Sequence, residues 1–306
     1  MDKIYKDTAV IGAGPSGVTA SIYLKRGGVD FVLFENELVG GKVNVTAEID
    51  NYPPINHISG FELGQKYEED LKYNDIKVTR EKVIEVSKID NLFLVKTNKN
   101  EYFCKTVLLA SGATNKRLHV LNEDKFINKG ISGCAICDGN LFRNKPMAVV
   151  GGGNSALEEA LYLSTIASKV YIIHRRNEFR GSKQYLDSLK EKENVELLTP
   201  FVISECLGEN VLNGLRLKNV LTNEEKTIEV SALFEYVGLI ANTNYLKIDE
   251  VKDNNGFIII NEDCETCVKG LFASGDVTNK KLRQVIVASG DGAVASQSII
   301  NYLHLL

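Results

Sequence analysis

Two copies of one supersecondary pattern limit what this 306-residue chain can fold into. Each copy has a short apolar run, a glycine-rich turn, a helical pattern and a second apolar run. The first turn lies at residues 12–17 and the second at residues 151–156. Strand–turn–helix–strand units of this kind are typical of parallel sheets. We therefore predict an α/β protein with a parallel sheet around each turn.

The first turn reads Gly-x-Gly-x-x-Gly between a predicted strand and a predicted helix. Gly12 and Gly14 permit a tight turn whose backbone N–H groups can approach a pyrophosphate, and Gly17 lets the helix pack closely on the strand. The second apolar run ends at Glu35, where a carboxylate can accept hydrogen bonds from ribose hydroxyls. The pattern predicts a site for FAD or NAD. The alternative is a glycine turn beside a solvated glutamate.

The second turn has the same spacing, with alanine in the third place: Gly151, Gly153, Asn154, Ser155 and Ala156. Its second apolar run ends in a basic group, formed by His174, Arg175 and Arg176 with Arg180 close behind. Guanidinium groups bind phosphate in bidentate fashion, whereas an acid would repel it. This predicts a site for the 2′-phosphate of NADP, and the alternative is a solvated basic helix start.

Two dinucleotide sites in one chain, one of them for NADP, favour transfer of a hydride from nicotinamide to a flavin that passes the electrons on. The predicted fold class is therefore α/β with two Rossmann-like domains, one for FAD and one for NADPH.

A Cys-x-x-Cys pair, Cys134 and Cys137, stands just before the second turn. Such a pair can hold an exchangeable disulfide or half of a zinc site. A zinc ribbon spaces its two pairs by about 15–20 residues, but the second pair here, Cys264 and Cys267, lies far along the chain. We predict a redox role for Cys134 and Cys137, and no metal site. Asp138 is either a helix cap or a proton donor to a departing thiolate.

Cys264 and Cys267 precede a predicted strand and are interpreted as packing residues. Residues three apart on an extended strand point to opposite faces, so the two would not bridge easily.

Bulk composition argues against several other classes. The net charge is −4, with both signs mixed along the chain, which gives no reason to expect nucleic acid or an anionic membrane as partner. We find no apolar stretch long enough for a signal peptide or a membrane-spanning helix. A cytoplasmic location is therefore expected, and there the 6 cysteines would not form a disulfide framework.

The order of these motifs resembles that of the low-molecular-weight, NADPH-dependent thioredoxin reductases of the bacterial type. The resemblance covers essentially the full length and includes Gly275 and Asp276, followed by Arg283, Gln284 and Val285. It implies a homodimer in which residues 1–112 and 242–306 form a discontinuous FAD-binding domain. Residues 113–241 would form an inserted NADPH-binding domain that carries the cysteine pair.

The resemblance also implies roles for single residues. The flavin contacts would be Gly12, Gly14, Pro15, Ser16, Glu35, Gly41, Asn51, Asp276, Arg283, Gln284 and Val285. The 2′-phosphate contacts would be Arg175, Arg176 and Arg180. Cys137 would face the flavin, and Cys134 would attack the disulfide of the partner. Lys42 departs from the family, which usually has glutamine there, and a lysine near the flavin would change its electrostatics.

The implied reaction is reduction of the thioredoxin disulfide by NADPH, through FAD and the Cys134/Cys137 disulfide. One alternative is a reductase for a related redoxin or a peroxidase system. Peroxide-linked reductases usually carry an extra N-terminal domain, whereas this chain starts at its predicted FAD strand. A second alternative is a non-catalytic module that senses NADPH or flavin, which an intact Cys-x-x-Cys beside both cofactor motifs disfavours. Retention of Arg175, Arg176 and Arg180 argues against the sister branch that takes electrons from ferredoxin.

Overall fold

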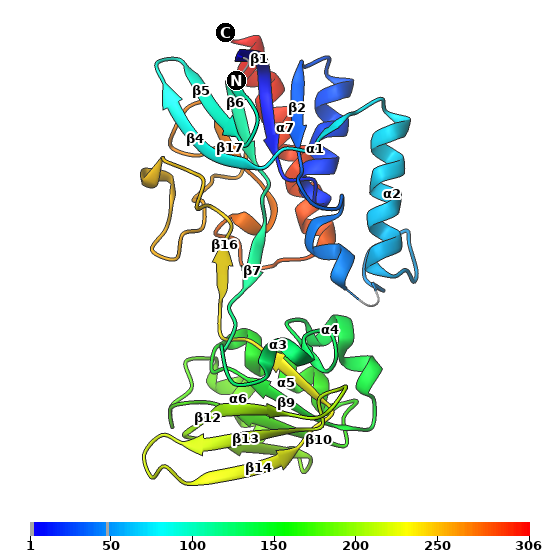
Figure 1. Ribbon diagram of the computed structural model, residues 1–306, viewed down its shortest axis with the longest axis vertical. Coiled ribbons are helices and arrows are strands. Elements are labelled where there is room, and N and C mark those ends of the chain that lie inside the picture. The colour runs from blue at the N-terminus through cyan, green and yellow to red at the C-terminus, as the bar shows by residue number, and fades with distance from the viewer. Residues whose placement is uncertain (1–2, 47–48) are drawn as a thin grey trace. The chain divides into compact units, whose positions relative to one another are not determined.

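The computed structural model describes residues 3–46 and 49–306 (Figure 1). The chain divides into two compact units: unit 1 is Met1–Thr114 with Ile240–Leu306, and unit 2 is Asn115–Leu239. Each unit contains a sheet with parallel strands, so the predicted α/β class is confirmed. Residues 1, 2, 47 and 48, which the expected range 1–112 includes, lie outside the described residues.

Unit 1 is built on one mixed sheet. Its strands are β1 (Lys3–Ile11), β2 (Phe31–Phe34), β3 (Val78–Thr79), β4 (Val83–Ile89), β5 (Leu92–Thr97), β6 (Glu101–Leu109) and β17 (Leu271–Ala273). The order is β3-β2-β1-β6-β5-β4, and β17 pairs with β6. The strands around β1 run parallel, whereas β4, β5 and β6 form an antiparallel meander.

Helices α1 (Pro15–Arg26), α2 (Gly60–Tyr73) and α7 (Val285–His304) pack with the strands of unit 1 in one core. Pro15 stands in the first turn of α1, where the missing N–H would have no helical partner anyway. Helices α1 and α7 lie side by side although they come from opposite ends of the chain (Figure 1). They approach so closely that a Cβ on Gly292 would lie 2.2 Å from the Ser16 carbonyl oxygen. Both ends of the chain are therefore needed to build this unit.

Unit 2 has a five-stranded parallel sheet of order β11-β10-β9-β15-β8 and a three-stranded antiparallel sheet of order β12-β13-β14. The strands are β8 (Ile131–Ser132), β9 (Pro146–Val150), β10 (Lys169–Ile173), β11 (Val195–Leu198), β12 (Phe201–Leu207), β13 (Gly214–Asn219), β14 (Glu225–Glu229) and β15 (Ala232–Glu235). The helices are α3 (Glu123–Phe126), α4 (Ala135–Asp138), α5 (Asn154–Ser164) and α6 (Lys183–Lys190).

Strand β9 shows how the parallel sheet of unit 2 is covered on both faces. Met147 and Val149 belong to the core that contains α5 and α6. Ala148 and Val150 belong to the core that contains the antiparallel sheet. This alternation is the period-two pattern of a strand, and burial of both faces explains why β9 is apolar throughout.

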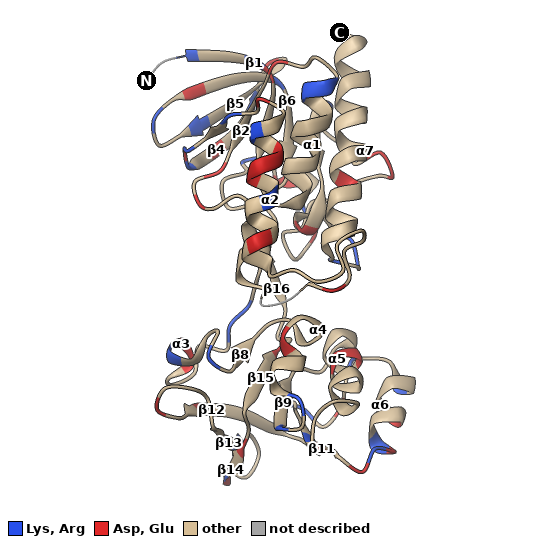
Figure 2. Cartoon of the chain, turned by 90° about the vertical axis from the view of Figure 1, so that its right-hand side faces the viewer, with Lys and Arg blue, Asp and Glu red and all other residues tan. Residues whose placement is uncertain are grey.

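Two short strands, β7 (Ala113–Asn115) and β16 (Leu239–Ala241), pair with each other where the chain passes between the units. Lysine and arginine are interspersed with acidic residues in each unit (Figure 2). No helix in the described part of the chain is long and apolar enough to cross a membrane.

We expect a buried carboxyl group at the end of β15 to make the stability of unit 2 depend on pH. Burial, and then the charge of Glu123, raise the pKa of Glu235 to about 8, and Arg117 opposes the shift. Glu235 Oε1 is buried and accepts no hydrogen bond from the described residues. Because the pKa is raised, the folded state holds a proton that the unfolded state releases, so stability falls as pH rises from about 4.5 to about 8.

We expect Glu235→Gln to remove this loss. Between pH 5.5 and 8.5, the wild type should lose roughly 2–4 kcal/mol of unfolding free energy relative to E235Q. Urea unfolding at each pH, followed by circular dichroism, measures the difference. The matched control is Glu229→Gln, since Glu229 is exposed at the end of the neighbouring β14. Parallel pH profiles for the wild type and E235Q would contradict the prediction.

Candidate functional site

The cysteine pair of unit 2 forms a disulfide. The Cys134 and Cys137 sulfurs are 1.99 Å apart and the Cα atoms 5.3 Å apart. Cys134 is the N-cap of the short helix α4, and the Cys137 N–H donates to Cys134 Sγ at 3.3 Å. The helical turn therefore brings the two sulfurs together.

Two further side chains hold this turn. The Ser132 hydroxyl, at the end of β8, accepts from the Cys134 N–H at 3.1 Å and donates to Asp138 Oδ2 at 2.5 Å. The Tyr236 hydroxyl accepts from the Ala135 N–H at 2.7 Å. Asp138 is thus oriented at the end of α4, close in sequence to the disulfide that it would serve as a proton donor. Neither Ser132 nor Tyr236 belongs to a motif, so neither could be predicted from the sequence.

The other cysteines are free thiols. Burial raises the pKa of Cys104 and Cys206 to about 12 and that of Cys264 to about 11, so these thiols are poor nucleophiles at neutral pH. The interpretation as packing residues holds for Cys264, which is buried in the core of unit 1. It is wrong for Cys267, which is exposed, because this segment is an irregular turn, with φ of +61° at Cys264, and not an extended strand. Residues 3–46 and 49–306 contain no cluster of three or more side chains suited to hold a metal ion.

The first glycine turn has the shape that only glycine allows. Gly12 has φ of +104°, and a Cβ there would lie 2.5 Å from the Ala110 carbonyl oxygen. A Cβ on Gly17 would lie 1.8 Å from the Gly12 carbonyl oxygen. Gly14 is the N-cap of α1 and supplies no side-chain cap, so the first N–H groups of the helix are open to a phosphate. The turn therefore fits the pyrophosphate of a dinucleotide.

Glu35 lies beside this turn, directly after β2. Its Oε2 accepts from the Ala13 N–H at 3.0 Å, and its Oε1 accepts from the Glu37 N–H at 2.9 Å. The segment that follows crosses the turn, because the Gly40 N–H donates to the Ala13 carbonyl at 2.8 Å. A Cβ on Gly41 would lie 3.5 Å from the Gly14 Cα. Glu35 and Gly41, two of the residues predicted for the flavin site, thus both lie next to the first glycine turn.

The C-terminal part of the chain joins the same turn. The Ser16 and Ser274 hydroxyls are 2.6 Å apart, and Ser274 precedes Gly275 and Asp276 in a 3₁₀ turn. The Arg283 Nε donates to the Asp276 carbonyl at 3.3 Å.

The residues at the start of α7 link to the loop after β2. Asn51 Nδ2 donates to Gln284 Oε1 at 3.1 Å, and Gln284 is the N-cap of α7, which begins at Val285. Residues predicted from both ends of the sequence for the flavin are thus brought to one part of unit 1.

Lys42 lies among charged members of this set. Although Lys42 keeps much of its surface exposed, burial lowers the pKa of its ammonium group, attraction to Asp276 opposes this, and Arg283 adds to it. Burial raises the pKa of Asp276, and Lys42 and Arg283 oppose that shift. Lys42 therefore interacts with two residues predicted for the flavin site.

The second glycine turn is held by the segment that carries the arginines. The Gly151 N–H donates to the Ile173 carbonyl at 3.0 Å, and the Arg180 N–H donates to the Gly152 carbonyl at 2.8 Å. Asn154 Oδ1 accepts from the Ser182 N–H at 2.7 Å. A Cβ on Gly153 would meet no atom within 4 Å. The turn is open at Gly153 and tied to the basic segment at Gly152.

His174 and the three arginines differ in their placement. His174 is buried beneath Gly152, where a Cβ would lie 2.3 Å from its ring, and its Nε2 is 3.2 Å from the Glu178 carbonyl. Burial lowers the pKa of His174, and the nearby arginines add to this. Arg175, Arg176 and Arg180 are exposed, and the ion pairs found in the described ranges include none of them. The arginines are therefore available to a phosphate, whereas His174 packs under the turn.

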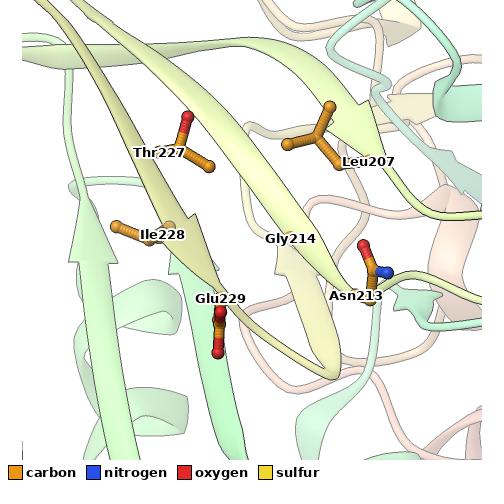
Figure 3. A pocket seen from close by; sticks show the side chains of 6 residues that line it. All are labelled: Leu207, Asn213, Gly214, Thr227, Ile228 and Glu229. Atoms are coloured by element: carbon orange, nitrogen blue, oxygen red, sulfur yellow. The ribbon is translucent and has the colours of Figure 1, made fainter.

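A pocket of about 340 Å³ lies elsewhere in unit 2, against the antiparallel sheet (Figure 3). Its lining residues are Leu207, Asn213, Gly214, Thr227, Ile228 and Glu229. It contains neither the cysteine pair nor a glycine turn, and nothing in its lining indicates catalysis.

Comparison with known proteins identifies relatives over the whole chain. A family model described as "Pyridine nucleotide-disulphide oxidoreductase" matches residues 6–292. Thioredoxin reductase of Mycoplasma pneumoniae is 40% identical over 99% of this chain and 96% of its own length. That of Ureaplasma parvum is 37% identical over 99% and 98%. The crystal structure of thioredoxin reductase from Streptococcus pyogenes superposes with a TM-score of 0.88 at 36% identity, with both chains fully covered.

Proposed function

Because this chain belongs to the pyridine nucleotide-disulphide oxidoreductases, and among them is similar to thioredoxin reductases along its full length, we propose that it reduces the disulfide of thioredoxin with electrons from NADPH. The observation that carries the proposal is the Cys134–Cys137 disulfide in the same unit as a nucleotide turn flanked by exposed arginines. A non-catalytic sensing module would need no such disulfide.

The cofactors are FAD and NADPH, which together supply two electrons by hydride chemistry when bound. We assign FAD to unit 1, supported by the open N-terminus of α1 and by Glu35. We assign NADPH to unit 2, where Gly151 and Gly153 form the turn and Arg175, Arg176 and Arg180 would bind the 2′-phosphate. Bidentate guanidinium groups suit that phosphate and have no counterpart in NADH.

The protein's own residues then carry the exchange. The Cys134–Cys137 disulfide takes up two electrons and two protons and becomes a dithiol. The Cys134 thiolate attacks the thioredoxin disulfide to form a mixed disulfide, and one thioredoxin sulfur leaves as a thiolate. Cys137 then attacks Cys134, which restores the disulfide and releases thioredoxin as the dithiol. Asp138, held by Ser132, is suited to give a proton to a departing thiolate.

The proposal includes a homodimer, as the resemblance to thioredoxin reductases implies, and the cytoplasmic location expected from the sequence. Light scattering during size-exclusion chromatography tests the dimer. The rival proposal is that the substrate is a related redoxin in place of thioredoxin, because both would present a disulfide to Cys134.

The test of function uses the purified, yellow, FAD-containing protein. NADPH oxidation should require an added thioredoxin and should produce one thioredoxin dithiol for each NADPH consumed. A panel of redoxins assayed under the same conditions separates the rivals. Turnover with another redoxin but not with thioredoxin would replace the substrate, and NADPH binding without turnover on any redoxin would favour a sensing module.

A further inference from the structure

The start of helix α4 is held by side chains from outside the helix. The first N–H groups of a helix have no partner within it. The Ala135 N–H donates to the Tyr236 hydroxyl at 2.7 Å, and the Cys137 N–H donates to Cys134 Sγ at 3.3 Å. Between them, the Ile136 N–H faces the carboxylate of Glu159. Two of these three acceptors, Tyr236 and Glu159, come from other elements of unit 2.

Both of these residues also adjoin the second glycine turn. Tyr236 follows β15, its N–H donates to the Val150 carbonyl at 2.9 Å, and a Cβ on Gly151 would lie 2.7 Å from its carbonyl oxygen. Glu159 stands on α5, the helix that begins at Asn154 directly after that turn. The cysteine pair and the nucleotide turn are therefore connected through Tyr236 and Glu159.

The Glu159 carboxyl group lies in an unusual environment. Its Oε2 is buried and accepts no hydrogen bond from residues 3–46 or 49–306. Burial raises the pKa of Glu159 to about 7, the Ile136 amide opposes this, Glu158 adds to it, and the Tyr236 hydroxyl opposes it. Burial also raises the pKa of Tyr236, as do the charges of Glu159 and of Asp138 on α4, so this hydroxyl stays protonated. Glu159 is thus the member of the group that changes charge near neutral pH.

We propose that Glu159, together with Tyr236, is a positioning residue for the Cys134–Cys137 pair, and that its protonation state sets how readily this disulfide is reduced. The ionised carboxylate holds the Ile136 N–H and the Tyr236 O–H more strongly than the neutral acid does. It also adds a negative charge beside the Ile136 amide, in the short helix between the two sulfurs, which must themselves become thiolate. As pH rises through neutrality, the hydrogen bonds that hold the start of α4 become stronger, and the thiolate forms of Cys134 and Cys137 become less stable. This inference rests on the proposed function, in which the pair is reduced and reoxidised in each cycle.

The test follows reduction of the disulfide in the FAD-containing protein by dithiothreitol, a dithiol that transfers two electrons and becomes a cyclic disulfide. Free thiols are trapped with an alkylating agent and counted by mass spectrometry, at pH 6 and at pH 8. At pH 6, where Glu159 is neutral, Glu159→Gln should match the wild type. At pH 8, the equilibrium ratio of reduced to oxidised protein should be roughly threefold or more higher in E159Q.

A second variant tests the positioning role by another route. Tyr236→Phe removes the acceptor for the Ala135 N–H and one group that lowers the Glu159 pKa. It should change the rate of disulfide reduction at both pH values. It should also move the step, that is, the change in disulfide reduction that accompanies ionisation of Glu159, to higher pH. The control Glu158→Gln alters an exposed neighbour and should keep the pH dependence, moved only slightly to lower pH because Glu158 is one of the groups that raise the pKa of Glu159.

The outcomes separate this inference from the proposed function. Equal pH dependence of disulfide reduction in the wild type, E159Q and Y236F would overturn the inference, even if the wild type reduces thioredoxin normally. Loss of the step in E159Q would support it, even if thioredoxin proved to be the wrong redoxin.

Discussion

Replacing either Cys134 or Cys137 with serine should abolish thioredoxin reduction while FAD stays bound and reducible by NADPH. A hydroxyl cannot form the disulfide that joins these residues, so no exchange with thioredoxin is possible. The glycine turns and Glu35 are untouched by either change. Turnover is measured as NADPH consumption in the presence of thioredoxin, and flavin reduction by its absorbance under anaerobic conditions.

The control is Cys267→Ser, since Cys267 is an exposed free thiol on an irregular turn. This variant, and Cys264→Ser, should remain active. Full activity in C134S or C137S would disprove the relay. An inactive C267S of normal stability would show that the second pair has a role that its placement does not reveal.

Replacing both Arg175 and Arg176 with alanine should weaken NADPH binding by about a hundredfold or more and leave NADH binding nearly unchanged. Hydrogen bonds to charged groups contribute roughly 1.5–3 kcal/mol each, and every 1.4 kcal/mol or so is a tenfold change in affinity. Neither arginine takes part in an ion pair of the described residues, so the substitution breaks no such pair. Equilibrium titration of the FAD-containing enzyme with each nucleotide measures the effect.

Arg216→Ala provides a control for loss of positive charge. Arg216 lies on β13 of the same unit and pairs with Glu205 at 2.6 Å, on the antiparallel sheet and outside the turn. Its loss should affect the two nucleotides equally and slightly. If R175A/R176A weakened NADPH and NADH to the same extent, the arginines would be acting on the fold and not on the 2′-phosphate.

The parts of the site that could be predicted from sequence are those set by local backbone geometry. Gly12 and Gly17 leave no room for a Cβ, so the turn leaves a spaced glycine pattern that is readable without a structure. The arginines were proposed for the 2′-phosphate from their place alone, because the end of the second strand of such a unit lies near the ribose. The apolar runs on either side of the second turn were predicted as strands and are β9 and β10.

The parts that could not be predicted depend on contacts between residues distant in sequence. Tyr236 reaches Ala135 across 101 positions, and no local pattern marks it. Glu159 stands in an ordinary helical sequence, and only the packing of α4 against α5 gives its carboxyl group an altered environment. Cys267 was wrongly predicted to be a packing residue because its segment was taken as an extended strand. The segment is a turn, which exposes the side chain.

The pairing of α1 with α7, and of β6 with β17, constrains the order in which the protein is completed during translation. Unit 2 has its last strand, β15, by Glu235, whereas unit 1 still lacks β17 and α7 at that point. Domains generally fold as units as they emerge from the ribosome, so unit 2 can fold first. Until β17 and α7 are synthesised, β6 lacks its β17 partner and α1 lacks the helix that packs on it. A polypeptide truncated after unit 2 would therefore carry a folded unit 2 and an incomplete unit 1. Cellular proteases and chaperones would then recognise the exposed apolar surface of unit 1.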